Sequence, residues 1–426
     1  MKIIRKSTSA KKVISIIKDI LVVVRNEFQT MFKDRGVVIM LVLAPLAYPL
    51  LYCSLYKNET LIDVPVAAVD CSRSKESREL LRHFDATQNI RVVSRYASLA
   101  EAKQAYNQKK VHGVIFIPAD FSKKINSGEQ TTVSVYADIS SFMYYRIINQ
   151  ASNNCVMAMS NQIQVERLNA NGITGESATI LSNPIPFEGV VLYNEGAGFA
   201  SFLMPAVLIL ILFQTLFLGI GIIAGTSRGE NRFHVLVNSS VHRGETFRVI
   251  IGKSICYFTL YASWSFFILM LIPRAFNLPH IGIPFDILML LIPFLLASIF
   301  FSMTISVFMP HRETSMVVFM FMSLILLFLS GFSWPQSNIN GFWKVFAWVI
   351  PSTNGIQGYI KINSLGADLR HISFEYISLW VQTAVYFATT CWAYYWQINK
   401  SKIKSENQIE DQEEDSMEVS TNAILS

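Results

Sequence analysis

This 426-residue sequence is short of charge. Only 15% of the residues are Asp, Glu, Lys or Arg, whereas soluble proteins usually carry about 25%. Hydrophobic residues make up 52% instead, which argues against an ordinary soluble domain and predicts a membrane protein. The net charge of +6 requires no nucleic acid partner, because most basic residues flank apolar runs, as the positive-inside rule expects.

Cysteine is scarce and scattered. Cys53, Cys256 and Cys391 lie in apolar runs, while Cys71 and Cys155 lie in the one large polar segment. The sequence has no Cys–x–x–Cys or Cys/His spacing that is typical of a metal site, so we expect this chain to bind no metal and no cofactor. Cys71 and Cys155 could form a disulfide or remain two free thiols, and the sequence does not decide between these alternatives.

The N-terminal region lacks a long apolar core. No small-residue cleavage site follows the first apolar run, so we expect no removable signal peptide. The first 36 residues hold nine Lys and Arg. Apolar residues recur at helical spacing from Val13 to Phe28, with most of the basic residues between them. This pattern predicts an amphipathic helix along the inner membrane surface.

Six apolar runs are long enough to cross a bilayer as helices, which takes about 20 residues. None contains Asp, Glu, Lys or Arg, and intramembrane charges are what mark ion or proton coupling. The sequence therefore argues against a proton-driven transporter. The six runs are Val37–Tyr56, Ala200–Ala224, Ser254–Ile272, Ile287–Met309, Ser315–Ser333 and Tyr376–Ile398.

Basic residues concentrate on one side of these runs, which the positive-inside rule makes cytoplasmic. This side comprises the N-terminus, residues 225–253 with five Lys and Arg, the turn at Arg312 and the start of the tail. Both termini, including the acidic tail 399–426, are therefore expected in the cytoplasm. Residues 57–199 and 334–375 are expected outside it.

The large polar insertion between the first two runs alternates strand and helix patterns, which indicates a small α/β domain. A Ser98–Glu101 pair has capping-box spacing at the start of one helix. The expected strands are Val64–Val69, Ile90–Ser94, Val111–Ile117 and Thr131–Tyr136, and the expected helices are Ser72–Phe84, Ser98–Gln108 and Ser141–Leu168.

The sequence lacks the residues that would make the chain an ATPase or another enzyme. Gly252, Lys253 and Ser254 resemble the end of a phosphate-binding loop, but Phe247 stands where such a loop needs its first glycine. Paired carboxylates and nucleophile–base sets are also lacking. We therefore expect no enzyme activity from this chain, and an ATP-driven process would need a separate ATPase chain.

Three stretches, in their order and spacing around the six runs, resemble one family. They are VPVAAVDCSRSKESRELL with its later partner VHGVIFIPADFSKKINSGE, then SRGENRFHVLVNSSVHRGETFRVIIGK, then GFSWPQSNINGFWKVFAWVIPSTN with its continuation GIQGYIKINSLGADL. The chain resembles the membrane (permease) subunit of type-2 ATP-binding-cassette (ABC) exporters, in a bacterial subgroup with a large external α/β domain. The resemblance implies an α-helical polytopic membrane protein. It would have six transmembrane helices, an N-terminal interfacial helix, an extracytoplasmic α/β domain and a re-entrant segment after span five.

The resemblance also implies that residues 225–253 form a coupling loop that docks on a cytoplasmic ABC ATPase, which would bind ATP and Mg. The alternative is a solvated loop whose arginines only set the topology. The permease would work as a homodimer or as a heterodimer with a homologue. The residues expected to dock are Arg228, Glu230, Arg232, Arg243 and Glu245 through polar contacts and Phe233, Leu236 and Phe247 through an apolar face.

Polar uncharged residues within the runs have two interpretations. Gln214, Thr215, Ser302 and Gln382 could line a transport pathway, or they could be helix-packing groups.

The stretch after the fifth run is too broken to cross a membrane and too apolar for an ordinary surface loop. Gly341–Ile350 would span about 15 Å as a helix, half of the ~30 Å hydrocarbon core. We predict a re-entrant hairpin with a polar turn at residues 336–340, which would act as an outer gate. An interfacial helix is the alternative. The expected gate residues are Trp334, Pro335, Asn338, Gly341, Trp343, Trp348 and Pro351.

Together these features predict an exporter permease in the bacterial cytoplasmic membrane that moves an amphipathic or lipid-like compound outward. Membrane lipids and a periplasmic adaptor are further expected partners. The alternative is a receptor or scaffold that does not transport and binds through its external domain.

Overall fold

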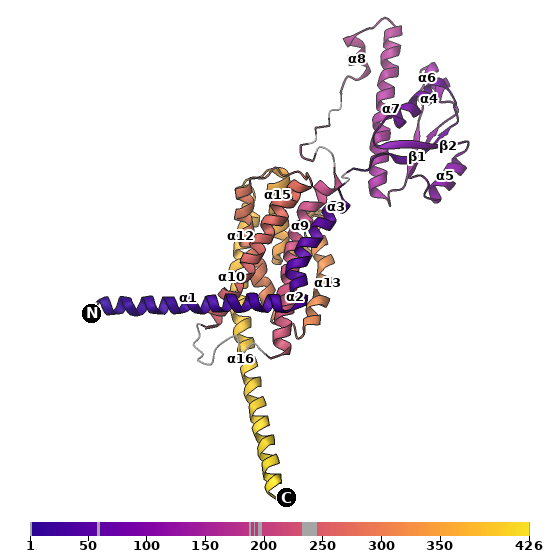
Figure 1. The fold of residues 1–426 in the computed structure, drawn as a ribbon. Coiled ribbons are helices and arrows are strands. Elements are labelled where there is room, and N and C mark those ends of the chain that lie inside the picture. Colours follow the sequence, from indigo (N-terminus) through magenta and orange to yellow (C-terminus); the bar gives the residue numbers. More distant parts are fainter. Residues whose placement is uncertain are drawn as a thin grey trace. The chain divides into compact units, whose positions relative to one another are not determined.

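The structure is a computed structural model that describes residues 2–57, 60–186, 189–190, 192–194, 198–231 and 245–425 (Figure 1). The chain divides into two compact units. Unit 1 comprises Met1–Lys57 and Tyr193–Ser426, and unit 2 comprises Asn58–Leu192. The described part of unit 1 is built from helices, and the sheet belongs to unit 2.

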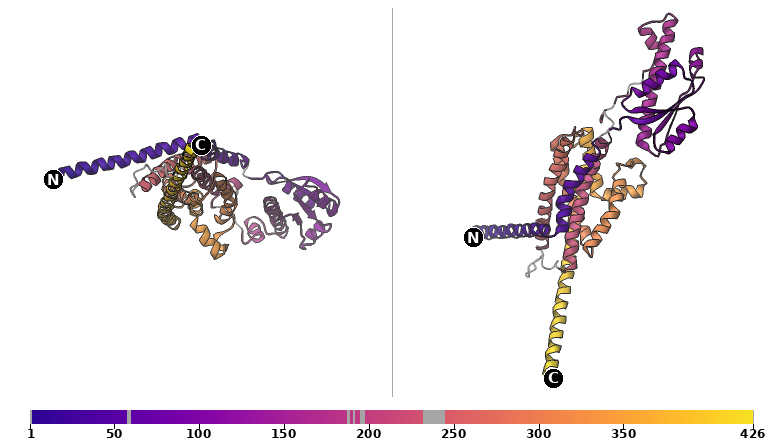
Figure 2. Two further views of the ribbon diagram at one scale, coloured as in Figure 1. Left: turned by 90° about the horizontal axis from the view of Figure 1, so that it is seen from below. Right: turned by 45° about the vertical axis from the view of Figure 1, so that its right-hand side comes forward.

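Unit 1 begins with α1 (Lys2–Lys33), which lies crosswise to the helices of the bundle in both side views (Figures 1 and 2). The sequence predicted this helix between Val13 and Phe28. Near its C-terminal end α1 packs on the bundle through Phe28 and the buried Met31, while Ile17 and Leu21, on the same helical face nearer the N-terminus, are exposed. Only the last part of the predicted apolar face is therefore packed within the chain.

The first predicted span is a helix with a π-helical turn in its middle. Pro45 has no N–H to donate to the carbonyl of Leu41 four residues earlier, and the indole Nε1 of Trp264 donates to that carbonyl at 3.0 Å instead. A side chain from another helix thus satisfies the backbone group that the proline leaves free. The elements are α2 (Arg35–Val38), η1 (Ile39–Leu43) and α3 (Ala44–Leu55).

The helix α9 (Phe199–Gly229) lies at the centre of the bundle, where most of its side chains are buried and where it packs against α3, α12, α13 and α15. The other elements of unit 1 are α10 (Glu245–Phe266), η3 (Phe267–Leu271), α11 (Ile272–Ala275), α12 (Pro284–Ser306), α13 (Arg312–Leu329), η4 (Gln336–Asn338), α14 (Gly341–Val349), α15 (Pro351–Leu365) and α16 (Ser373–Leu425). The last of these, drawn in yellow in Figure 1, runs on beyond the bundle.

Five helices in the described part of the chain are long and apolar enough to cross a membrane. The sixth predicted run, Tyr376–Ile398, forms the first part of α16 and packs along α12. Its Trp, Tyr, Thr and Gln residues make it less apolar than the others, so the count of six spans stays a prediction. The five are Arg35–Leu55, Phe199–Gly229, Thr246–Ala275, Pro284–Ser306 and Arg312–Leu329.

Unit 2 is built around a four-stranded sheet with the strand order β2-β1-β3-β4. The central strand β1 pairs in parallel with β2 and β3, and β4 pairs antiparallel with β3. The strands are β1 (Val64–Asp70), β2 (Ile90–Tyr96), β3 (Gly113–Ile117) and β4 (Ser134–Ala137), and the helices are α4 (Lys75–Asp85), α5 (Leu99–Asn107), α6 (Phe121–Ser127), α7 (Phe142–Ala170) and α8 (Glu176–Ser182).

Helices cover both faces of this sheet because side chains alternate along a strand. Val66 and Ala68 of β1 belong to a core that includes α4, α6 and α7, whereas Ala67 and Val69 belong to a core with α5. The strand and helix patterns in the sequence match these elements closely. The exceptions are β4 and α4, which each begin three residues later than predicted, and the short helices α6 and α8, which were not predicted.

One expected detail of unit 2 is only half present. The Ser98 hydroxyl caps α5 by accepting the N–H of Glu101 at 3.3 Å, as predicted. The reciprocal arrangement of a full capping box occurs instead at α4, where the Ser74 and Ser77 side chains each accept the other's backbone N–H.

The two cysteines of unit 2 are free thiols in this structure. Cys71 is exposed just after β1, whereas Cys155 is buried in α7 and its Sγ lies 3.6 Å from the carbonyl of His83.

Candidate functional site

The helix α10 begins at the end of the predicted coupling loop, and its first turns pack along α1. A glycine permits the close approach, because a Cβ on Gly252 would lie 2.6 Å from Cγ1 of Val23. One turn further, the Sγ of Cys256 lies 3.8 Å from the Sδ of Met31. The end of the bundle where α9 finishes and α10 begins is called the α1 end below.

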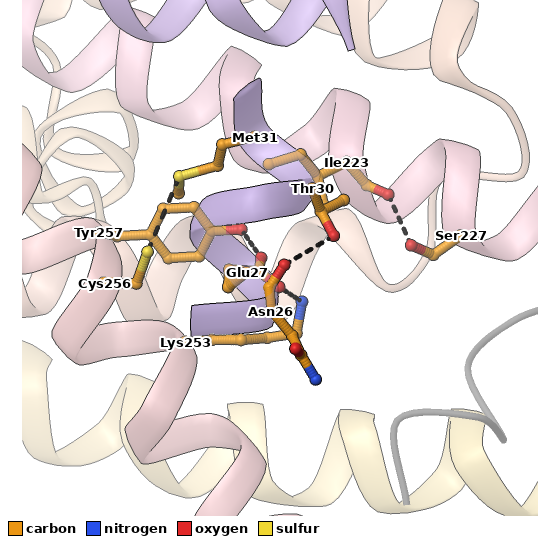
Figure 3. A network of polar contacts seen from close by, with 9 residues as sticks. All are labelled: Asn26, Glu27, Thr30, Met31, Ile223, Ser227, Lys253, Cys256 and Tyr257. Atoms are coloured by element: carbon orange, nitrogen blue, oxygen red, sulfur yellow. Dashed lines mark hydrogen bonds and ion pairs between the residues drawn. The ribbon is translucent and has the colours of Figure 1, made fainter. Parts of the chain in front are cut away.

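A buried ion pair ties α1 to α10 (Figure 3). The Lys253 ammonium donates to Oε2 of Glu27 at 2.6 Å, and the hydroxyl of Tyr257 donates to Oε1. The charged side chains are only 6% and 5% exposed. Each charge compensates the other and both carboxylate oxygens accept a hydrogen bond, which offsets the cost of taking the charges out of water. The three residues therefore hold α1 in one position on α10.

A second ion pair, between Arg248 Nη1 and Asp19 Oδ2 at 2.7 Å, joins the same two helices nearer the start of α10. Its side chains are 27% and 48% exposed. Solvent-exposed pairs contribute roughly 0–1 kcal/mol, so the buried pair dominates the link between α1 and α10.

Further contacts gather the other helices at the α1 end. The Arg228 guanidinium, in the last turn of α9, donates to the carbonyl of Val307 after α12. Arg312, which begins α13, lies 3.5 Å from the carboxylate of Asp34 between α1 and α2. Polar contacts therefore link the last turn of α9 to the end of α12, and the start of α13 to the residue between α1 and α2.

The predicted docking residues are only partly described. Arg228 is engaged within the bundle, Glu230 follows the end of α9, and the exposed ring of Phe247 meets the ring of Phe387 edge-on at 5.7 Å. Glu245 is the first residue of α10. The remaining ones lie outside the described residues, namely Arg232, Phe233, Leu236 and Arg243.

Three of the four predicted pathway residues are buried in the chain. Thr215 donates to the carbonyl of Ile211 at 2.7 Å, Ser302 donates to the carbonyl of Ser298 at 2.6 Å, and Gln382 donates to the carbonyl of Trp348. The Thr215 and Ser302 contacts are within their own helices, and the Gln382 contact joins α16 to α14. The choice between pathway lining and helix packing stays a prediction.

The fourth pathway residue differs. Gln214 is half-buried and lines an apolar hollow of about 90 Å³ between α9, α12 and α13, together with the rings of Phe213, Phe217 and Phe301. Of the four, it is the one that borders open space.

The helices α14 and α15 meet at a sharp turn at Ile350, which is both the C-cap of one and the N-cap of the other. The turn lies beside the middle of two longer helices: Tyr386 of α16 donates to the carbonyl of Val349, and Gly355 of α15 lies against Phe294 of α12. The hairpin turn is therefore at Ile350 and not at residues 336–340, where the chain forms the short η4.

The predicted gate residues are spread along this hairpin. Trp334 and Trp343 are exposed, whereas Trp348 is fixed by donating from Nε1 to the Ser378 hydroxyl at 3.1 Å. A Cβ on Gly341 would meet nothing within 4 Å. In chain order, from the approach to α14 to the first residue of α15, the gate residues are Trp334, Pro335, Asn338, Gly341, Trp343, Trp348 and Pro351.

The Glu27–Lys253 ion pair was not predicted from the sequence. Two signals were available: Glu27 is an acidic residue on the same helical face as Val24, Phe28 and Met31, and Lys253 directly precedes a long apolar run. A charge on an apolar face needs a partner. Nothing in the sequence, however, matches two residues that are 226 positions apart.

The part of the chain that the structure describes contains no group of three or more His, Cys, Asp or Glu that could hold a metal ion.

Comparison with known proteins gives one family. A family model described as "ABC-2 family transporter protein" matches residues 35–392, which is well over half of the chain. A search of curated proteins found no match. The matched region runs from the first helix of the bundle into α16 and includes unit 2. With its membrane-spanning helices, the chain therefore belongs to the ABC-2 transporter family, as a multi-pass membrane component of an ABC transporter that works with an ABC ATPase.

Proposed function

We propose that this chain is the permease subunit of an ABC exporter and that a separate cytoplasmic ATPase drives it by acting on the segment between α9 and α10. The observation that carries this proposal is the buried Glu27–Lys253–Tyr257 cluster at the start of α10. It would make a movement of that segment a movement of α10 and α1 together.

The proposed orientation follows from the basic residues. The α1 end would face the cytoplasm, with α1 along the inner membrane surface and the start of α16 as a sixth span. Unit 2 would then lie outside, as expected for residues 57–199. A bacterial cytoplasmic membrane, two permease chains side by side and a periplasmic adaptor complete the proposal.

The hairpin of α14 and α15 would be re-entrant. It enters and leaves at the end of the bundle away from α1, and its turn reaches the level of Phe294 in the middle of α12. Irregular backbone at that depth must be buried in protein or face water. Ile350 and Pro351 are buried and Trp348 is hydrogen-bonded, which suits a gate that moves as one piece.

The docking assignment is tested by co-purification with a co-expressed ABC ATPase. The charge reversals Arg232→Glu and Arg243→Glu should each weaken the complex, because both arginines lie in the segment proposed to dock. The matched control is Arg370→Glu, an exposed arginine between α15 and α16, which should leave the complex intact. A complex that resists both reversals would show that the ATPase docks elsewhere.

Transport itself is tested by reconstituting the complex in vesicles and measuring ATP-dependent movement of fluorescent amphiphiles. Movement that needs hydrolysis and this chain supports the exporter. If an ATPase never associates and unit 2 alone binds a ligand, the receptor or scaffold alternative takes its place.

A further inference from the structure

A polar-floored pocket opens between α14, α15 and the start of α16. Its volume is about 400 Å³, and its lining includes Lys344, Trp348, Thr353, Phe374 and Glu375. Ligand sites in proteins typically have about 300–1,000 Å³, mostly apolar walls and a few well-placed polar groups. The size and the lining of this pocket both fit that description.

Two buried polar atoms on the lining have no partner in the described part of the chain. Glu375 is 7% exposed, and its Oε1 accepts from Lys361 Nζ at 2.6 Å, but its Oε2 accepts nothing. The hydroxyl of Thr353, which is 2% exposed, is also unpaired. Leaving a buried acceptor unpaired costs stability. Both residues line the pocket, so the headgroup of a guest there is the candidate partner for these two atoms.

The charges around the pocket favour an anion. Glu375 is neutralised by Lys361, which leaves Lys344 of α14 as an exposed cation without an ion-pair partner among the described residues. A ligand with one negative group would complement Lys344, while a hydroxyl or amine on the same headgroup could donate to Oε2 of Glu375. A simple organic cation would satisfy the carboxylate but would face Lys344.

The amides of Gln336, Asn354 and Gln357 also line the pocket. Its apolar surface comes from Val345, Trp348 and Phe374, and the indole of Trp348 is oriented by its hydrogen bond to Ser378. Aromatic side chains offer large apolar surfaces for an alkyl chain or ring. A soluble headgroup alone would leave these walls uncovered.

We propose that this pocket binds an anionic amphiphile whose headgroup also carries a hydroxyl or amine donor. The proposal rests on the proposed export function and names its substrate class. Lys344 would hold the anionic group, Oε2 of Glu375 and the Thr353 hydroxyl would bond the polar headgroup, and the apolar walls would cover the start of the tail.

The test is binding to the purified full chain in a maltoside detergent, measured by native mass spectrometry. The probe is myristoyl-lysophosphatidylglycerol, which has a phosphate anion, hydroxyl donors and a tail. Tetradecyltrimethylammonium is the cationic comparison, and glycerol phosphate is the comparison without a tail. The lysolipid should bind at least about tenfold more tightly than either.

Variants assign the binding to the pocket. Lys344→Ala removes the cation that would hold the phosphate, so affinity for the lysolipid should fall about tenfold or more. Thr353→Val removes the hydroxyl at nearly the same side-chain volume and should also reduce the affinity. The control Arg370→Ala removes an exposed charge from the segment between α15 and α16 and should leave the affinity for the lysolipid unchanged.

Three results would overturn the proposal: tighter binding of the cationic amphiphile, equal binding of glycerol phosphate, or lysolipid binding that the pocket variants leave unchanged. The measurement needs no ATPase. Loss of the ATPase complex would therefore count against the proposed transport function and leave this test unaffected, and a failed binding test would leave the docking assignment standing.

Discussion

At the scale of single residues, the Glu27–Lys253 pair has the largest energetic consequence in the α1 end. Removing one partner of a buried pair leaves an uncompensated charge and costs about 3–5 kcal/mol, whereas replacing both partners by apolar residues is often close to neutral. Without Lys253, Glu27 would retain only the hydrogen bond from the hydroxyl of Tyr257. The pair should therefore behave as a unit.

This behaviour can be measured with a double-mutant cycle. Glu27→Leu and Lys253→Met should each lower the free energy of unfolding by about 3–5 kcal/mol, and the double variant should lose clearly less than the sum. Unfolding of the purified chain in detergent is the readout. The exposed pair supplies the control, because Asp19→Ala and Arg248→Ala should each cost about 1 kcal/mol or less. Strict additivity for the buried pair would contradict the structure.

The same residues show the limit of sequence reasoning at this scale. The pattern around Val24 and Phe28 predicts which face of α1 is apolar, and the structure packs the last part of that face on the bundle. The sequence pattern does not predict which distant side chain contacts Glu27, because a contact between α1 and α10 depends on how the helices pack. Arg228 is a similar case: the sequence assigns it to docking, while the structure directs it to the carbonyl of Val307.

At the scale of elements, two departures from α geometry coincide with prolines. The π-helical turn η1 lies just before Pro45, and η3 lies just before Pro273. Proline alone does not produce such a turn, because Pro205 and Pro293 lie inside the α-helices α9 and α12. The sequence does not identify the indole of Trp264 as the donor to the freed carbonyl, since that requires the packed bundle. The turn at Ile350 was misplaced for a related reason: polar residues suggested a turn at 336–340, but the chain reverses at an apolar residue before Pro351.

Helix packing around α9 depends on the absence of a side chain at one position. A Cβ on Gly225 would lie 2.8 Å from backbone atoms of both His311 and Arg312, whereas a Cβ on Gly229 in the same helix would meet nothing within 4 Å. Backbone atoms cannot move aside as a flexible side chain can. Gly225→Ala should therefore destabilise the chain by about 1–3 kcal/mol.

The comparison within one helix provides the control. Gly229→Ala should be neutral or slightly stabilising, by up to about 1 kcal/mol, because alanine favours helix and meets no neighbour. Thermal unfolding in detergent separates the two variants. Equal effects of the two substitutions would mean that α9 and the start of α13 are not in the contact that the structure gives them.

At the scale of the whole molecule, the sequence predicts the division into a helical bundle and an α/β unit, because hydropathy and strand alternation are local signals. Orientation across the membrane rests on the distribution of Lys and Arg alone, and unit 2 contains the residue that can test it. Cys71 is exposed on unit 2, and Cys155 is buried in the same unit.

A membrane-impermeant maleimide should label Cys71 in spheroplasts, because the proposed topology puts unit 2 outside the cytoplasm. The Cys71→Ser variant should lose this labelling. Cys155 should stay unlabelled until the protein is denatured, since burial shields its thiol and raises its pKa, which lowers the fraction of reactive thiolate. Mass spectrometry of the labelled chain distinguishes the two sites.

Labelling of Cys71 only in inside-out vesicles would reverse the orientation and move the coupling segment to the outer side, where no cytoplasmic ATPase could reach it. Labelling of both cysteines only after reduction would instead reveal the Cys71–Cys155 disulfide that the sequence left open, and α7 would then have to shift to expose its buried thiol.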